Sequence, residues 1–467
     1  MKIQIPFIGG AYKADSLNIN AQECINLYPV VDAQQEPAVV ALVGIPGCKQ
    51  WVDIGVSVEI RGMIEFDGYI YAVCGDTVYK ISSSGAKTAL STTLDTSTGP
   101  VWMEHNGLEV MITDDTYGYL VNSDVVSKIT DADFPTPSSL TYQDGYFIVT
   151  EKDTGRYWLS ALLDGSSWNA LDYTTSEGLP DDAVSCLMAN RELWNFGEIS
   201  TEIYYNSGAS DFPFERLPNG FFKTGIGAAH SAVNMDNSVF WFTDKRQVVV
   251  ASNYSPVIIS TPQIDAHFSR MSTVSDAIGF AYTQMGHTFY QLTFPTEGET
   301  WVYDAATRLW HQRKSYKSGS VTDGRHRANC YFRFNGKHLV GDYNNGKIYE
   351  LDPDTYEDNG EVKRWKRTCQ YIQKNGERVF FANLQLFFES GVGLVTGQGD
   401  DPEVMLKWSD DGGHTWSNEH WANIGAIGEY GHRTIWRRLG KSRSRTFSIE
   451  GTDPVKTVII KAVADIS

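Results

Sequence analysis

The chain has 467 residues, of which 42% are apolar, 21% are charged and 13% are aromatic. This is the composition of a globular protein, so an intrinsically disordered chain is excluded. The formal net charge of −18 disfavours a general nucleic-acid-binding protein. No apolar run approaches the ~18–20 residues that span a bilayer, so we expect no membrane anchor.

The charge is distributed unevenly along the chain. Residues 1–360 contain 24 Lys and Arg against 44 Asp and Glu, a net of −20. Residues 361–467 contain 15 against 13, a net of +2. This difference in charge predicts that the two parts are different structural bodies.

We expect no signal peptide at the N-terminus. The opening run MKIQIPFIGG is interrupted by Pro6 and by Gly9 and Gly10, so it lacks an unbroken apolar core. The six cysteines lie far apart without a Cys-x-x-Cys pair, which favours reduced thiols in a protein assembled in the cytoplasm. We expect residues 1–60 to form an N-terminal segment that contributes a ring-closing strand and assembly contacts.

One unit recurs through the next 300 residues: a turn pair, an aromatic and β-branched strand, a polar turn and a second strand. Its copies occupy residues 67–81, 106–121, 144–160, 190–206, 236–252, 285–304 and 335–352. Their starts are 38 to 50 residues apart, which is the period of propeller blades. A single hairpin cannot bury both of its faces, so each copy must be stacked against its neighbours. The repeat predicts an all-β fold with a six- or seven-bladed β-propeller over residues 61–360.

Helices are hard to place, because Gly, Pro and β-branched residues interrupt the candidate windows. One window, residues 262–274, has a helical stripe formed by Ile264, Phe268 and Met271. After a turn-rich boundary near residues 352–367, five or more strand-like runs follow within about 100 residues. They predict a small jelly-roll-like β-sandwich over residues 361–467.

The octet SDDGGHTW in this second body matches the Asp-box pattern of sialidase propellers. Its fixed positions are Ser409, Asp411, Gly413, Thr415 and Trp416. In such a turn the Asp accepts backbone N–H bonds, the Gly takes positive φ and the Trp packs beneath. A sialidase would add several boxes on successive blades, an arginine cluster and a Tyr/Glu pair, and no such arrangement is found. We interpret the octet as a structural turn, with glycan contact as the alternative.

The chain offers no other motif of catalysis. Adjacent carboxylates such as Asp114-Asp115 read as hairpin tips, and the ten histidines show no paired spacing. Nucleophile-elbow and phosphate-loop motifs are absent. We therefore expect no enzyme, no catalytic residue, no cofactor and no metal site.

A cationic run near the C-terminus is the candidate interface. It contains Arg433, Arg437, Arg438, Lys441, Arg443 and Arg445, six positive groups in 13 residues with no acid among them. Three interpretations remain open: a solvated face, a dock for an acidic partner or for the acidic propeller of a neighbouring copy, and contact with DNA phosphate.

Several short motifs occur in an order that resembles a known family. They are Asn26-Leu27-Tyr28-Pro29, then Pro46-Gly47, then Arg61-Gly62 before the first hairpin, and Trp436-Arg437-Arg438-Leu439-Gly440 near the end. Together they resemble the tail hub, or packaged-DNA stabilisation protein, of short-tailed (podovirus-like) bacteriophages, over essentially the whole length.

This resemblance implies a virion structural protein without enzymatic activity. Such a hub assembles in the host cytoplasm as a homo-oligomeric ring, expected to be a hexamer, below the portal and adaptor proteins of the tail. It helps to close the DNA exit channel until ejection, and it carries a tail needle and tailspikes or fibres, with transient contact to packaged DNA. A rigid propeller with many loops suits that role. The alternative is a glycan-binding or glycan-cleaving propeller, suggested by the octet and the 13 tryptophans.

Overall fold

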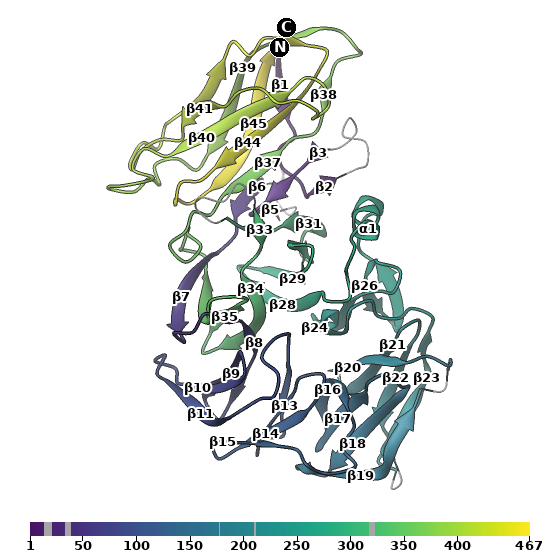
Figure 1. Cartoon of the computed structure of the whole chain (residues 1–467). Helices are drawn as coiled ribbons and strands as arrows, with labels where there is room; N and C mark the ends of the chain where they lie inside the picture. The colour runs from purple at the N-terminus through teal and green to yellow at the C-terminus, as the bar shows by residue number, and fades with distance from the viewer. Residues whose placement is uncertain (14–20, 33–38, 177, 210–211, 317–322) are drawn as a thin grey trace.

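The repeated hairpins form a ring of four-stranded sheets, in the lower part of Figure 1. The computed structural model describes residues 1–13, 21–32, 39–176, 178–209, 212–316 and 323–467. Within these ranges the sheets make seven blades, so the prediction of an all-β propeller is confirmed. The predicted hairpins supply the second and third strands of each blade.

Blades 1 to 4 are contiguous in the sequence, and the first strand of each is innermost. Blade 1 comprises β8 (Ile60–Phe66), β9 (Tyr69–Cys74), β10 (Thr77–Ile81) and β11 (Lys87–Thr93). Blade 2 comprises β12 (Trp102–His105), β13 (Val110–Thr113), β14 (Gly118–Asn122) and β15 (Val125–Lys128). Blade 3 comprises β16 (Pro137–Gln143), β17 (Tyr146–Glu151), β18 (Arg156–Ala161) and β19 (Asp164–Thr175). Blade 4 comprises β20 (Ala183–Ala189), β21 (Glu192–Gly197), β22 (Thr201–Asn206) and β23 (Phe214–Phe222).

Blades 5 to 7 complete the ring and include its helical elements. Blade 5 follows the 3-10 helix η1 (Ala229–Ser231) and comprises β24 (Val233–Met235), β25 (Ser238–Phe242), β26 (Val248–Ser252) and β27 (Ser255–Ile258). Helix α1 (Pro262–Ser269) leads to blade 6, which comprises β28 (Ile278–Gln284), β29 (His287–Phe294), β30 (Glu299–Asp304) and β31 (Leu309–Gln312). The short pair β32 (Lys314–Ser315) and β33 (Gly324–Arg325) precedes blade 7, made of β34 (Ala328–Phe334), β35 (Lys337–Asp342), β36 (Lys347–Asp352) and β7 (Gly47–Asp53).

The turns inside the blades explain why these hairpins close tightly. Asp67 (φ 50°) and Gly68 (φ 76°) both have positive φ between β8 and β9. Asp236 (φ 51°) and Asn237 (φ 58°) repeat this between β24 and β25. Turns with two such residues match the twist of the flanking strands, and Asp, Asn and Gly tolerate them best.

The N-terminal segment closes the ring. Strand β7 pairs antiparallel with β36 as the outermost strand of blade 7. The innermost strand of blade 7, β34, lies against β8 of blade 1. Helix α1 is shorter than the predicted window of residues 262–274, although Ile264, Phe268 and Met271 are all buried.

The second body is a β-sandwich at the top of Figure 1. One sheet has the order β42 (Thr434–Arg437), β39 (Val379–Phe388), β45 (Val458–Ile466), β6 (Val39–Gly44) and β5 (Leu27–Asp32), with β1 (Lys2–Ile5) paired to β45 and β43 (Lys441–Ser442) to β39. The other has β4 (Cys24–Ile25), β37 (Trp365–Thr368), β44 (Ser444–Gly451), β40 (Glu403–Ser409) and β41 (His420–Asn423), with β38 (Ile372–Gln373) paired to β44. The pair β2 (Tyr12–Lys13) and β3 (Ala21–Gln22) stands beside them.

The sequence suggested a sandwich built from residues 361–467 alone, but the structure adds strands from the N-terminal segment. Strands β1, β4, β5 and β6 of the N-terminal segment complete its sheets. Strand β4 also pairs with β31 of blade 6, at Ile25 and Gln312, and with β37. One hydrogen-bonded sheet therefore runs from the propeller into the sandwich.

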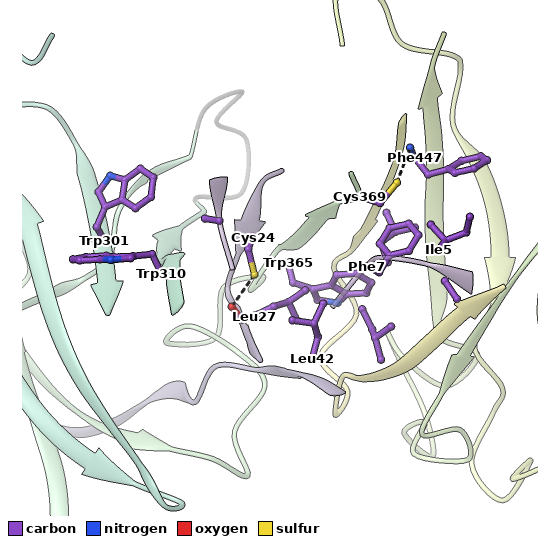
Figure 2. Packing of buried hydrophobic residues seen from close by; sticks show 14 of the residues in the cluster. Ile5, Phe7, Cys24, Leu27, Leu42, Trp301, Trp310, Trp365, Cys369 and Phe447 are labelled. Atoms are coloured by element: carbon purple, nitrogen blue, oxygen red, sulfur yellow. Dashed lines mark hydrogen bonds between the residues drawn. The ribbon is translucent and has the colours of Figure 1, made fainter. Parts of the chain in front are cut away.

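The hydrophobic core is also continuous across this joint. One buried cluster extends from Trp301 and Trp310 of blade 6 to Phe447 of the sandwich. Figure 2 shows Phe7, Leu27, Leu42 and Trp365 between them. Because the two bodies share both a sheet and a core, their relative orientation is fixed by packing rather than by a linker.

Candidate interaction surface

The predicted cationic run folds into two short strands on the edge of one sandwich sheet. Strand β42 pairs with β39 through Arg437 and Asn383, and β43 pairs with it through Lys441 and Phe380. Between them the chain turns at Arg438 (φ 62°), whose backbone N–H donates to Ala382. The run therefore bends around the beginning of β39.

Four of the six predicted cations project freely from this edge. Arg437, Arg438, Lys441 and Arg443 are exposed, and among the described residues none has an ion pair or a side-chain hydrogen bond. Arg433 is exposed as well, and its Nη2 donates to Oε1 of Gln385 at 3.0 Å. Unpaired exposed cations form a field that attracts an acidic partner.

Arg445 does not belong to this surface, and its assignment as an interface residue is wrong. It is 2% exposed, and its Nε and Nη2 atoms bind the two carboxylate oxygens of Asp410 at 2.6 and 2.7 Å. Its guanidinium also lies 4.6 Å from the ring centroid of Phe381 and 5.2 Å from that of Trp408. Alternation along β44 turns this side chain into the sandwich.

Strand pairing adds residues that the sequence interpretation missed. Lys374 and Arg378 precede β39, are exposed, and have no side-chain partner among the described residues. Exposed Phe380 lies opposite Lys441 and exchanges backbone hydrogen bonds with Ser467. The whole group is thus at the end of the sandwich where Figure 1 places both termini, away from the propeller. Since these residues are about 60 positions from the run, only the pairing of β39 with β43 reveals them.

A small apolar pocket opens at the same end. Its volume is about 170 Å³. It is lined by Met1, Ile3, Ile372, Gln373, Lys374, Val379, Phe381, Arg443 and Ile466. Lys374 and Arg443 thus place positive charge around an apolar floor. We call the exposed cations Lys374, Arg378, Arg437, Arg438, Lys441 and Arg443 the cationic end.

The octet at residues 409–416 forms a turn whose hydrogen bonds are local. Oδ1 of Asp411 accepts from the Thr415 N–H at 2.9 Å, and Oδ2 accepts from the Thr415 hydroxyl at 2.6 Å. The Ser409 hydroxyl donates to Asp411 at 2.7 Å and accepts from the Gly413 N–H at 2.8 Å. The Thr415 and Ser409 donors hold the pKa of Asp411 well below its usual range.

The tryptophan of the octet differs from the expectation. Trp416 is 37% exposed rather than packed beneath the turn. The neighbouring Trp408 is partly buried against the core, and it is stacked on His420 with ring centroids 4.5 Å apart. Gly413 has φ 99°, a conformation that favours glycine.

A cavity of about 260 Å³ lies at the joint between the two bodies. Tyr28, Phe289 and Trp365 are among the residues that line it. So is Lys363, whose Nζ donates to the Ile45 carbonyl at 2.5 Å. Burial lowers the pKa of Lys363 to about 8.

No group of three or more His, Cys, Asp or Glu side chains in the described part of the chain is placed to hold a metal ion. None of the described helices is long and apolar enough to cross a membrane.

Two family models match nearly the whole sequence. One, described as "Bacteriophage P22 Gp10, beta-propeller", matches residues 3–356. The other, described as "Bacteriophage P22 Gp10, beta-sandwich", matches residues 364–467. Their division of the chain follows the propeller and the sandwich. No curated protein matches the sequence.

Solved structures provide weaker likenesses. A streptogramin B lyase is 10% identical, with 65% of this chain and 96% of that chain covered and a TM-score of 0.44. Virginiamycin B lyase from Staphylococcus aureus is 11% identical, with 63% and 94% covered and a TM-score of 0.44. BamB from Moraxella catarrhalis is 9% identical, with 62% and 82% covered and a TM-score of 0.40. With TM-scores below 0.5, these likenesses carry no argument about function.

Proposed function

The chain belongs to the bacteriophage P22 Gp10 family, and from that premise we propose that this phage tail structural protein is a hub of the virion tail. The hub forms a homo-oligomeric ring, a hexamer, below the portal and adaptor proteins. There it helps to close the DNA exit channel and carries the tail needle and the tailspikes or fibres. It acts by assembly, not by catalysis.

The observation that carries this proposal is the rigid joint between the two bodies. Strand β4 bonds to blade 6 on one side and to β37 on the other, so a load on the sandwich reaches the propeller through backbone hydrogen bonds. The shared core around Trp365 adds packing that resists bending. A ring that retains packaged DNA needs subunits that keep their shape under pressure.

The acidic propeller is consistent with a position near DNA. Residues 1–360 carry a net charge of −20, which repels the phosphate backbone. A channel wall of that sign lets DNA slide past without binding. Contact with the packaged DNA is therefore transient.

The test is nuclease protection of packaged DNA. Particles assembled with portal and adaptor proteins but without this chain should lose their DNA to added nuclease, and addition of the chain should restore protection. Negative-stain microscopy of the same particles should show a ring at the portal vertex. Protection that is independent of the chain, or a chain that never joins the vertex, would contradict the proposal.

One observation favours a second role in glycan binding. Trp416 and Trp421 are 37% and 51% exposed on the sandwich, and exposed aromatic rings stack on sugars. If this role is real, Trp416→Ala and Trp421→Ala should weaken binding to host polysaccharide while nuclease protection is unchanged. Hydrolysis of that polysaccharide, abolished by a carboxylate substitution, would instead favour an enzyme.

A further inference from the structure

The charge of the molecule is polarised between its two ends. Residues 101–220 contain 20 Asp and Glu against 5 Lys and Arg, a net of −15. This stretch covers blades 2 to 4, and Figure 1 places blades 2 and 3 at the bottom, far from the sandwich. The cationic end lies at the opposite extreme of the molecule.

Blade 3 presents an apolar side chain within this acidic region. Leu171 belongs to the outermost strand, β19, and is 81% exposed. Trp168 pairs with Ser160 and Tyr173 with Trp158, so residues 169–172 bulge out of the β18–β19 ladder. We call these four residues the Leu171 bulge.

Two carboxylates lie next to the Leu171 bulge. Asp172 follows Leu171 directly, and Oδ2 of Asp133 accepts from the Ala170 N–H at 3.2 Å. The exposed Asp164 lies at the start of the same strand. Among the described residues none of these three carboxylates has an ion pair.

The two ends are therefore complementary in both chemistry and shape. One presents an apolar pocket of about 170 Å³ flanked by Lys374 and Arg443, and the other presents a protruding leucine flanked by carboxylates. The elongated shape in Figure 1 keeps them apart within one chain, so they can meet only between copies. We propose that the cationic end of one copy binds blade 3 of a second copy, with Leu171 of the second copy inserted into the pocket of the first.

Such a contact is head-to-tail. Different surfaces meet, so each copy keeps one free end of each kind, and repetition closes into a ring when the rotation allows it. The apolar anchor supplies affinity, and the charges supply the encounter rate and the register. This inference rests on the proposed ring-forming function and names the surfaces that form the ring.

The first experiment measures self-association of the full chain by sedimentation velocity at low salt. Leu171→Ser and the double variant Arg437→Glu/Arg438→Glu should each weaken association by about tenfold or more. Val395→Ser is the matched control for Leu171, because Val395 is 79% exposed but lies on the sandwich. Lys223→Glu/Lys245→Glu is the control for charge, since both lysines are exposed on the propeller. Both controls should associate like the wild type.

The second experiment locates the contact. In a mixture of copies with and without ¹⁵N, a lysine cross-linker should join Lys374 or Lys441 of one isotopic form to Lys152 of blade 3 in the other. The proposal is overturned if the wild type stays monomeric across the micromolar range, if the controls fail equally, or if cross-links join other surfaces. The proposal is also overturned if the chain does not self-associate but shifts DNA in a gel, and if this shift depends on Arg437 and Arg438. The cationic end would then be a binding site for DNA phosphate.

Failure of the hub proposal would look different. If copies associate through Leu171 but never join a portal vertex, the hub proposal is wrong and the proposed contact between copies is retained. If the Leu171→Ser variant assembles fully and the particles keep their DNA, the hub proposal is retained and the proposed contact is wrong.

Discussion

Asn26 and Lys314 exchange two hydrogen bonds of 2.9 Å, one from Asn26 Nδ2 to the Lys314 carbonyl and one from the Lys314 N–H to Asn26 Oδ1. Asn26 Nδ2 also donates to the Arg364 carbonyl at 2.7 Å. A single buried side chain thus ties the N-terminal segment to the chain just after blade 6 and to the chain just before β37. Asn26 has φ 55°, which asparagine tolerates better than most residues.

Replacement of Asn26 by Ala should lower the free energy of unfolding by about 3 kcal/mol, because buried backbone groups lose their partners and alanine is strained at positive φ. Urea unfolding measures the change. Asn375→Ala is the matched control, since Asn375 also has positive φ (46°) but is exposed. It should cost only the backbone strain, about 1 kcal/mol. Equal losses in the two variants would show that the hydrogen bonds of Asn26 contribute nothing.

The two partners of the Asp410–Arg445 pair should respond unequally to truncation. The Asp410 side chain is 42% exposed and Arg445 is 2% exposed. Asp410→Ala should therefore cost about 3 kcal/mol, because a buried guanidinium loses its counter-charge. Arg445→Met should cost only about 1 kcal/mol, because Asp410 stays hydrated and methionine fills the site among Phe381 and Trp408. Chemical denaturation gives both values, and the reverse order would contradict the assignment.

The stability contributed by Asp411 should depend on pH in a defined direction. Its folded pKa lies below that of the unfolded chain, so the carboxylate stabilises the fold above about pH 4, and this contribution is lost on acidification. Melting temperatures of the wild type and of Asp411→Asn should differ at pH 7, with the wild type higher. The gap should close as the pH falls below about 4. A gap that is constant from pH 7 to pH 3 would exclude a role for the charge.

The stability contributed at Lys363 should also rise with pH, but in the alkaline range. Its folded pKa of about 8 is below the unfolded value of about 10.4, so between these pH values the unfolded chain binds more protons. The wild type should therefore gain stability relative to Lys363→Met as the pH rises from 8 to 10, by up to about 3 kcal/mol. Lys245→Met, at an exposed lysine, is the control and should show no such gain.

Ring closure should be sensitive to Gly47 at the start of β7. A Cβ atom at this position would lie within 2.5 Å of the Glu357 carbonyl oxygen, and backbone cannot move aside without cost. Gly47→Ala should lower stability by about 1–3 kcal/mol and should increase proteolysis in blade 7. Gly431→Ala is the control, because a Cβ there meets no atom within 4 Å. If both variants behave alike, the tight contact at Gly47 does not restrain closure.

The sequence by itself determined that the chain is all-β, with a propeller followed by a sandwich. The period of 38 to 50 residues and the turn pairs such as Asp67-Gly68 encode each hairpin locally, because a tight turn and alternating side chains act over a few residues. The ordered motifs from Asn26 to Gly440 were enough to indicate the family to which the chain belongs.

Tertiary structure alone decided which side chains share a surface. Arg445 stood in the cationic run but is buried against Asp410, because it belongs to β44, a strand paired on both sides with β37 and β40. Lys374 and Arg378 joined the cationic end through the pairing of β39 with β43, and the N-terminal strands entered the sandwich beside residues more than 300 positions away. Such pairings depend on the packing of the whole chain, and no local pattern of residues carries them.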